Sequence, residues 1–241
     1  MELVVLGCNG SYAAPGGACS GYLLLDGDTR IWLDCGPGTL ANVQEHVALA
    51  DITAVVVSHS HPDHWGELPV LHNALHYFMG RKDVPLYTTG DTLHRYEVAR
   101  GGPTTKAFAT HVIEDGSTFE IDGVRFRTSR TDHPVETMAM RIEAGGRSLI
   151  YSADTGPDWS LEALGAVDVA LCEATLRADE SRQAPHLTTI EAGTSARRAG
   201  AERLIITHPP PGADADAHQR EAADAFGQDV EVTTINARFT I

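Results

Sequence analysis

The sequence is poor in basic residues. Its 241 residues contain 18 Lys and Arg against 33 Asp and Glu, which gives a formal net charge of −15. Proteins that bind polymeric nucleic acid neutralise its phosphates with Lys and Arg, so this balance argues against such a partner. The pair Arg197-Arg198 is the most evident basic cluster, and the surface of a helix explains it. We therefore expect a small-molecule substrate.

Cysteine and long apolar runs are also scarce. The four cysteines, Cys8, Cys19, Cys35 and Cys172, show no C-x-x-C spacing, and nothing in their placement implies a disulfide framework. No run approaches the ~20 apolar residues that a membrane helix needs. The amino terminus lacks the basic region and the long apolar stretch of a signal peptide. These absences predict a cytoplasmic protein that does not associate with membranes.

Apolar residues are nevertheless plentiful enough for a core. They make up 42% of the chain, and its length suits one α/β domain or two fused half-domains. Short β-branched runs predict strands, and longer periodic ones predict helices. The expected strands include Tyr22–Leu25, Ile31–Asp34, Ala54–Val57, Pro85–Thr88, Val167–Cys172 and Arg203–Thr207; the expected helices are Gly38–Ala48, Trp65–Met79, Thr92–Arg100, Thr188–Ala199 and Asp216–Phe226, with one more after Pro157. The segment Gly101–Lys106 is expected to be a mobile loop.

The most informative stretch is His59-Ser60-His61-Pro62-Asp63-His64, which places three imidazoles and a carboxylate within six residues. It follows the predicted buried strand Ala54–Val57, and α/β folds place their chemistry on loops that leave the carboxyl ends of strands. Imidazole and carboxylate suit Zn²⁺, Mn²⁺ or Fe²⁺. The chain has 12 histidines, so a polar loop that happens to be His-rich is the alternative. Four ligand-type residues directly after a core strand favour the metal site.

The spacing within this stretch predicts two ions rather than one. Pro62 biases His61 towards an extended conformation, in which residues two apart point the same way. His59 and His61 can therefore converge on one ion. Asp63 and His64 lie past the proline, where the chain can turn into a helix, and they can face a second ion. We expect two divalent cations, with Zn²⁺ preferred and Mn²⁺ or Fe²⁺ as alternatives.

The motif HSHPDH matches the His-x-His-x-Asp-His signature, and the sequence resembles the metallo-β-lactamase fold superfamily on this motif. Other blocks that look like this family are Leu3–Ser11, Leu33–Gly38, Tyr151–Gly156, Leu171–Thr175 and Ile206–His208. The later blocks are most similar to the branch that contains ribonuclease Z, the tRNA 3′-processing endonuclease, and small bacterial phosphodiesterases. The resemblance implies a single domain over residues 1–241 with an α/β, four-layer αββα sandwich.

The resemblance also implies three further metal ligands. They are His133, which would join His59 and His61 on the first metal, Asp154, which would bridge both ions, and His208, which would join Asp63 and His64 on the second. All three follow predicted strands, as a site at one rim of a sheet requires. Capped turns or solvated loop histidines are the alternative interpretation of these positions.

The candidate catalytic residues are Asp63, His186 and Glu173. In the ribonuclease Z branch a histidine at the position of His186 donates a proton to the leaving alkoxide, and Glu173 would be the carboxylate that supports it. The alternative is a surface histidine before a helix and a buried, hydrogen-bonded glutamate. His72 and His76 lie four apart on a predicted helix and are expected to line a pocket or an interface rather than to bind metal.

The leading functional prediction is a phosphodiesterase that acts on a small phosphodiester or a cyclic nucleotide. The family blocks indicate the phosphodiester, and the acidic charge indicates its small size. A carboxylic ester, thioester or lactone hydrolase is the alternative, because the same fold hosts those reactions. Further alternatives are a tRNA 3′-processing endonuclease, a di-iron redox protein and a non-catalytic sensor. The branch also suggests a homodimer.

Overall fold

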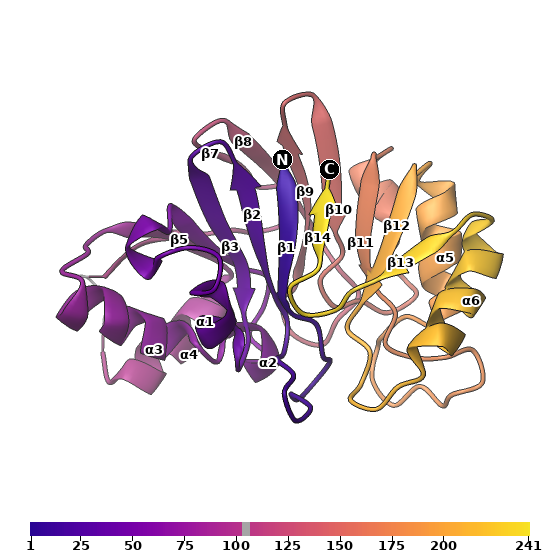
Figure 1. Cartoon of the computed structure of the whole chain (residues 1–241), viewed down its shortest axis with the longest axis horizontal. Helices are drawn as coiled ribbons and strands as arrows, with labels where there is room; N and C mark the ends of the chain where they lie inside the picture. The colour runs from indigo at the N-terminus through magenta and orange to yellow at the C-terminus, as the bar shows by residue number, and fades with distance from the viewer. Residues whose placement is uncertain (103–106) are drawn as a thin grey trace.

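Two mixed β-sheets form the centre of the molecule in the computed structural model, which describes residues 1–102 and 107–241 (Figure 1). Over these residues each sheet has seven strands. The two termini lie side by side, since the first and last strands pair antiparallel (Figure 1). Of the expected mobile loop, residues 103–106 lie outside the described residues.

The first sheet joins the amino-terminal half of the chain to the last strand. Its strands are β1 (Glu2–Gly7), β2 (Gly21–Asp26), β3 (Thr29–Cys35), β4 (Ala54–Val57), β5 (Val84–Thr88), β6 (Phe108–Val112) and β14 (Arg238–Thr240). They are arranged in the order β14-β1-β2-β3-β4-β5-β6. The pairs from β14 to β3 are antiparallel, and those from β3 to β6 are parallel.

The second sheet repeats this plan. Its strands are β7 (Thr118–Ile121), β8 (Val124–Arg130), β9 (Met138–Ala144), β10 (Arg147–Tyr151), β11 (Val169–Glu173), β12 (Arg203–Thr207) and β13 (Val230–Val232). The order is β13-β12-β11-β10-β9-β8-β7, antiparallel from β7 to β10 and parallel from β10 to β13. Both sheets thus have parallel strands whose carboxyl ends can carry loop residues to one rim.

Helices cover the outer face of each sheet, so the αββα sandwich predicted from the sequence is confirmed. The helices α1 (Thr39–Val43), α2 (Pro62–Trp65), α3 (Leu68–Asn73) and α4 (Gly90–Arg100) lie beside the first sheet, and α5 (Thr189–Arg198) and α6 (Ala215–Phe226) lie beside the second (Figure 1). Short 3₁₀ turns cover Leu49–Asp51 and Leu161–Leu164. Among the described residues, no helix combines the length and the apolar character needed to cross a membrane.

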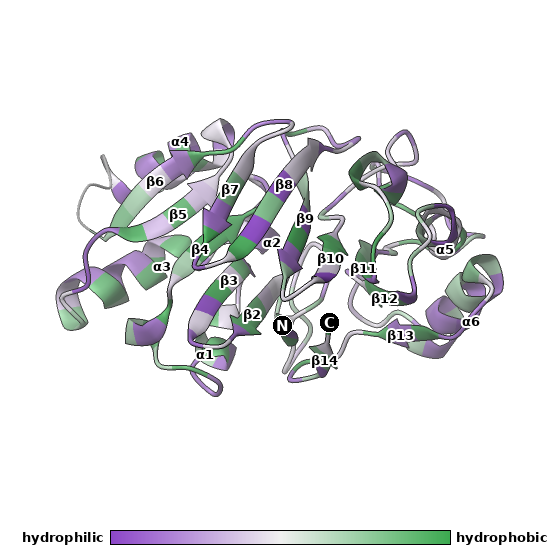
Figure 2. Cartoon of the chain, turned by 90° about the horizontal axis from the view of Figure 1, so that it is seen from above, coloured by the Kyte–Doolittle hydropathy of each residue, from purple (hydrophilic) through white to green (hydrophobic). Residues whose placement is uncertain are grey.

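The core consists of three apolar layers, one between the sheets and one under each set of helices. The central layer includes Leu3, Tyr22, Phe126, Leu149 and Val169, all of them buried. Strand β8 has one face in the core and the other in solvent, because buried and exposed residues alternate along most of its length (Figure 2). This alternation is what a sheet with one solvated face requires.

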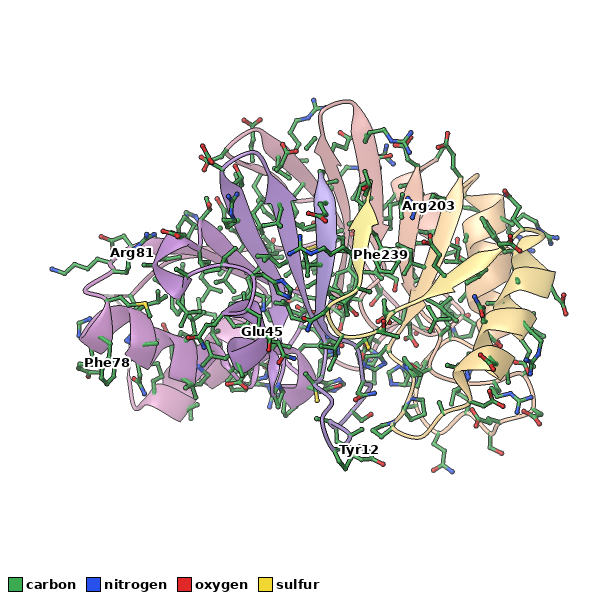
Figure 3. The ribbon with its side chains drawn as sticks, in the orientation of Figure 1. Tyr12, Glu45, Phe78, Arg81, Arg203 and Phe239 are labelled. Carbon is green, nitrogen blue, oxygen red and sulfur yellow. The ribbon has the colours of Figure 1, made fainter. Side chains whose placement is uncertain are left out.

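The predicted continuous helix over Trp65–Met79 is wrong. The chain instead forms α2, breaks at Gly66 and Glu67, resumes as α3 and ends in a π-helical turn over Ala74–Phe78. Pro69 explains the break, because a proline has no N–H to donate and is tolerated only in the first turn of a helix. The π-helical turn leaves Phe78 exposed at the far end of the helical layer (Figure 3).

Two other predicted helices are shorter than expected. Only Thr39–Val43 of the expected Gly38–Ala48 helix is α-helical, and the chain continues in tight turns. The helix expected after Pro157 is the 3₁₀ turn at Leu161–Leu164. The strands Ala54–Val57 and Arg203–Thr207 have the predicted bounds.

A stack of aromatic rings joins the two sheets at their open edge. Phe126 stacks on Phe119 with ring centroids 4.7 Å apart, and Phe119 stacks on Tyr87 of the other sheet at 4.2 Å. His111 extends the stack beyond Tyr87 at 4.6 Å. Such contacts contribute beyond the area they bury, so this stack helps to hold the two sheets together.

We predict that Phe126→Ala lowers the free energy of unfolding by ~3–5 kcal/mol, because it leaves a cavity in the central layer. Phe126→Leu should cost less, since it fills part of the space. Tyr77→Ala, at a residue 69% exposed, serves as the control and should change the free energy by less than about 0.5 kcal/mol. Urea denaturation measures all three, and equal effects of Phe126→Ala and Tyr77→Ala would contradict the packing described.

Candidate metal centre

The predicted metal ligands come together on loops at one rim of the two sheets. His59, His61, Asp63 and His64 follow β4 of the first sheet. Loops after three strands of the second sheet bring the rest: His133 after β8, Asp154 after β10 and His208 after β12. Residues up to 145 positions apart in the sequence are therefore neighbours.

These side chains form two groups of possible ligands. The first group consists of His59, His61, His133 and Asp154; the second consists of Asp63, His64 and His208. Within each group one ligand atom per residue lies within 4.8 Å of every other. We call the space between the ligand atoms of the first group the first position, and that of the second group the second position.

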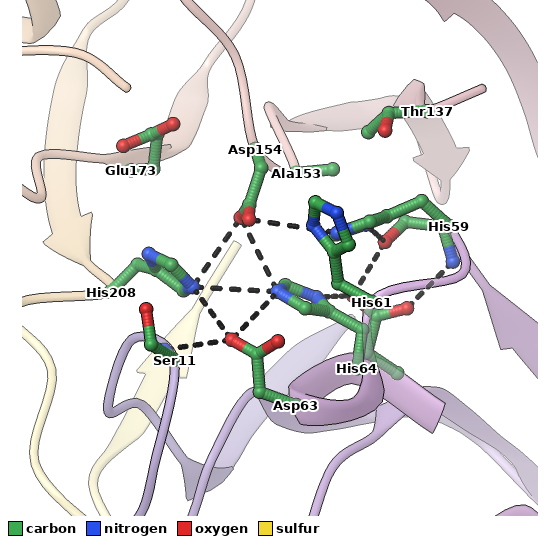
Figure 4. Close-up of polar contacts among 12 residues, drawn as sticks. Ser11, His59, His61, Asp63, His64, Thr137, Ala153, Asp154, Glu173 and His208 are labelled. Atoms are coloured by element: carbon green, nitrogen blue, oxygen red, sulfur yellow. Dashed lines mark hydrogen bonds and ion pairs between the residues drawn. The ribbon is translucent and has the colours of Figure 1, made fainter. Parts of the chain in front are cut away.

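The Asp154 carboxylate lies between the two groups (Figure 4). Its Oδ2 is 3.6 Å from Nε2 of His59 and 3.8 Å from Nε2 of His133. Its Oδ1 is 3.3 Å from Nε2 of His64 and 3.5 Å from Nε2 of His208. One carboxylate oxygen thus faces each position.

Asp63 completes the second group. Its Oδ2 lies 3.4 Å from Nε2 of His208 and 3.6 Å from Nε2 of His64. The same oxygen accepts a hydrogen bond of 2.8 Å from the backbone N–H of Ser11, in the glycine-rich loop after β1 (Figure 4). The loop after β1 therefore holds one of the candidate ligands in place.

The residues fit divalent cations. His59 Nε2 and Asp154 Oδ1 are buried and have no hydrogen-bond partner among the described residues. A buried polar atom without a partner is costly, and here both atoms face other ligand-type atoms. Five imidazoles and two carboxylates that converge in this way match the ligand preferences of Zn²⁺, Mn²⁺ and Fe²⁺. A cation at the first position would satisfy the His59 nitrogen, and one at the second would satisfy the Asp154 oxygen.

Three of the candidate histidines, His59, His133 and His208, are hydrogen-bonded through Nδ1 on the side away from the centre, which leaves Nε2 facing it. His59 Nδ1 is 2.9 Å from Ser58 Oγ, and His133 Nδ1 is 3.2 Å from the carbonyl oxygen of Pro185. His208 Nδ1 is 2.9 Å from Thr175 Oγ1. If each Nδ1–H donates outward, each Nε2 presents its lone pair to the centre, which is the tautomer that a metal ligand needs.

Asp34 is a functional residue that the sequence analysis missed. Its carboxylate accepts hydrogen bonds from the backbone N–H of Ser58 at 2.7 Å, the Ser58 hydroxyl at 2.8 Å, His64 Nδ1 at 2.8 Å and the Tyr151 hydroxyl at 2.7 Å. It backs His64 directly and His59 through Ser58. The signal available was an aspartate at the end of a predicted strand, in a block that resembles the family.

The protonation of the site follows from burial and charge. Burial lowers the pKa of His59, His61 and His133, which keeps these rings neutral and able to bind a cation. Burial acts in the same direction on His64, but the carboxylates of Asp154 and Asp34 outweigh it and raise its pKa well above the ordinary value. Burial alone would raise the pKa of Asp154, yet the surrounding histidines hold it well below its usual range.

His186 lies beside the two groups, next to Asp154 and His208. Its Nδ1 is 3.0 Å from Oε1 of Glu173, which is only 1% exposed. Burial would lower the pKa of His186, but the hydrogen bond and the charge of Glu173 raise it to about 9. His186 therefore carries a proton at neutral pH.

Glu173 lies where the carboxylate expected to support His186 would lie, and its contacts are those of a positioning residue. Its two oxygens are occupied by four donors, which are the backbone N–H groups of Thr155 and Leu187, the Thr175 hydroxyl and the His186 ring. A buried carboxylate with this many partners holds its neighbours and has little freedom to act on a substrate.

The backbone is strained around the centre. Four non-glycine residues at or beside the site have positive φ: Ser11 (63°), Asp34 (54°), Ala153 (51°) and His208 (66°). Such conformations cost energy and persist only where the surrounding structure enforces them. They occur at His208, at the residue before Asp154, at Asp34 behind His64, and at Ser11, whose backbone N–H contacts Asp63.

His72 and His76 do not belong to the centre. His72 is buried, and its Nδ1 lies 2.8 Å from the Tyr96 hydroxyl. The ring centroids of His72 and His76 are 5.8 Å apart. Neither occurs in a group of ligand-type side chains among the described residues, so His72 is a satisfied core histidine.

Comparison with known families settles the classification. A family model described as beta-lactamase superfamily domain matches residues 29–209, three quarters of the chain, including every candidate ligand. The chain belongs to the beta-lactamase superfamily. The family predicted from HSHPDH and the later blocks is therefore confirmed.

Relatives of full length support this assignment. The probable metallo-hydrolase YhfI of Bacillus subtilis is 29% identical to this chain over 238 residues, an alignment that covers 96% of each chain. The crystal structure of YhfI aligns with this one with a TM-score of 0.89 at 26% identity. That structural alignment covers 99% of this chain and 98% of YhfI. A ribonuclease Z of Mycobacterium bovis is 30% identical over 242 residues, which cover 88% of this chain and 86% of the relative. A diphosphatase from the PhnP family shares the fold, with a TM-score of 0.79 at 19% identity over 100% of this chain and 97% of that one.

We predict that Gly36→Ala disturbs the metal loop, because a Cβ on Gly36 would lie 1.9 Å from the carbonyl oxygen of Asp63. The clash should cost ~1–3 kcal/mol in unfolding free energy and reduce the bound metal per chain. Gly90→Ala is the matched control, since its Cβ would lie 4.0 Å from Cγ1 of Val112. Urea denaturation and metal analysis test both variants, and an undisturbed Gly36→Ala protein would refute the close approach.

Proposed function

We propose that this protein is a metal-dependent phosphodiesterase that holds two divalent cations and acts on a small phosphodiester such as a cyclic nucleotide. The observation that carries the proposal is the Asp154 carboxylate, which presents one oxygen to each of two groups of ligand-type side chains. A shared carboxylate of this kind suits two neighbouring ions.

The candidate ligands divide between the two cation positions. His59, His61 and His133 would hold a cation at the first position, Asp63, His64 and His208 would hold one at the second, and Asp154 would serve both. Bound divalent cations supply Lewis-acid chemistry, which activates water and stabilises negative charge on the group being cleaved.

His186 is the proton donor in this proposal. Glu173 raises the pKa of His186 and so favours its protonated form, and His186 lies next to Asp154 and His208. Its Nδ1–H is directed to Glu173, so the other ring nitrogen can deliver a proton to the departing oxygen of the substrate. Protonation of a leaving alkoxide typically contributes 10²–10⁴-fold to the rate.

Two observations support a small phosphodiester as the substrate. The relatives include a ribonuclease Z and a structurally similar diphosphatase, whose names both refer to phosphate chemistry. The net charge of −15 is unfavourable for a long polyanion, whose binding depends on Lys and Arg.

With Zn²⁺ or Mn²⁺ supplied, the purified protein should hydrolyse members of a diester panel that includes cyclic nucleotides. His61→Ala should reduce turnover by at least ~100-fold, because it removes a ligand and with it several kcal/mol of charge stabilisation. His76→Ala, which lies outside both ligand groups, is the control and should retain activity. Turnover of esters, thioesters or lactones without diester hydrolysis would replace this proposal, and metal binding without any turnover would indicate a sensor.

A second test addresses His186. His186→Ala should slow hydrolysis of an alkyl diester by ~10²–10⁴-fold. It should have little effect on a p-nitrophenyl diester, whose leaving group departs without a proton. The ratio of kcat/KM for the two substrates is the measurement, and an equal loss on both would exclude the role as proton donor.

A further inference from the structure

The histidines at the two positions differ in what lies behind them. At the first position His133 is backed by the carbonyl oxygen of Pro185, a neutral group, and His59 by the Ser58 hydroxyl, which donates to the Asp34 carboxylate. At the second position His64 is backed directly by the Asp34 carboxylate at 2.8 Å. His208 is backed by the Thr175 hydroxyl, which leads to another carboxylate.

Thr175 connects His208 to Glu173. Its Oγ1 lies 2.9 Å from His208 Nδ1 and donates a hydrogen bond of 2.6 Å to Glu173 Oε2. All three side chains are buried. Because the hydroxyl donates to the carboxylate, its oxygen is free to accept the proton of His208 Nδ1, and the negative charge of Glu173 polarises the whole chain of hydrogen bonds.

We propose that Thr175 transmits the charge of Glu173 to His208, and that this makes the second position the tighter of the two cation sites. This inference rests on the proposed function only in requiring that divalent cations bind. Thr175 is a positioning residue, since it acts through His208 and not on the substrate.

The carboxylates around the two positions also favour tighter binding of a cation at the second. The second position has Asp63 as a ligand and Asp34 directly behind His64, besides its share of Asp154, and Glu173 reaches His208 through Thr175. The first position has its share of Asp154, and Asp34 reaches His59 only through Ser58. Carboxylates that back metal-binding histidines raise their basicity, and their loss typically weakens metal binding 10–100-fold.

The test is a titration of the metal-free protein with Zn²⁺ in competition with a chromophoric chelator. The wild-type protein should bind two ions in separate steps of unequal affinity. Thr175→Val, which removes the hydroxyl at nearly constant volume, should weaken the tighter step 10–100-fold and leave the weaker step within about threefold. Thr175→Ser keeps the hydroxyl and should restore the tighter step.

Three further variants control the assignment. His133→Ala removes a ligand from the first position and should retain one tightly bound ion, whereas His208→Ala should lose the tight step. Thr128→Val alters another buried threonine, whose hydroxyl donates to the carbonyl oxygens of Glu114 and Ser117, and it should bind both ions like the wild type. If Thr175→Val fails to fold, Thr175→Ala removes the hydroxyl without adding a methyl group in its place.

Several outcomes would overturn the inference. They are two equal steps in the wild type, an unchanged tight step in folded Thr175→Val, or a tight step that survives in His208→Ala. Because the readout is metal affinity, an inactive protein that still shows these differences would refute the phosphodiesterase and leave the inference standing. A wild-type protein that binds no divalent cation would refute both.

Discussion

The placement of the buried Asp154 carboxylate between two groups of histidines is the constraint on which the rest of the site depends. A carboxylate that is 3% exposed is tolerated only where other groups stabilise its charge. Histidines from three separate loops lie on both sides of it, two facing each oxygen, and cations bound between them would offset its charge. The same arrangement that lets the charge remain buried also creates two adjacent places where a cation is favoured.

The sandwich brings these loops together at one rim. Parallel strands from both sheets deliver their carboxyl ends to one rim, and the central apolar layer holds the sheets in register. Two further buried carboxylates, Asp34 and Glu173, occupy the layer behind the ligands and orient the histidine rings. Asp34 and His208 have positive φ, a strained conformation that persists because the surrounding structure enforces it.

The candidate ligands could be named from the sequence because their signal is local. Pro62 makes His61 extended, with φ −74° and ψ 137°, and starts a helix at the same point. The later candidates each follow a strand whose apolar run is evident. The continuous helix predicted over Trp65–Met79 was wrong because the prediction rested on the apolar residues of this segment and ignored Pro69, which interrupts a helix. The roles of Asp34 and Thr175 could not be predicted, because their hydrogen-bond partners are distant in the sequence. Asp34 forms hydrogen bonds with residues 24, 30 and 117 positions away. Thr175 forms one with His208, 33 positions away.

The sequence by itself determined which side chains could bind metal and that each would stand at the end of a strand, since ligand type, strand periodicity and the proline effect are local properties. Only the tertiary structure decided which oxygen of Asp154 faces which histidine, and which carboxylate stands behind each ring. The reason is that these contacts form between loops of two different sheets. Their geometry depends on how the sheets pack, and packing is a property of the whole chain.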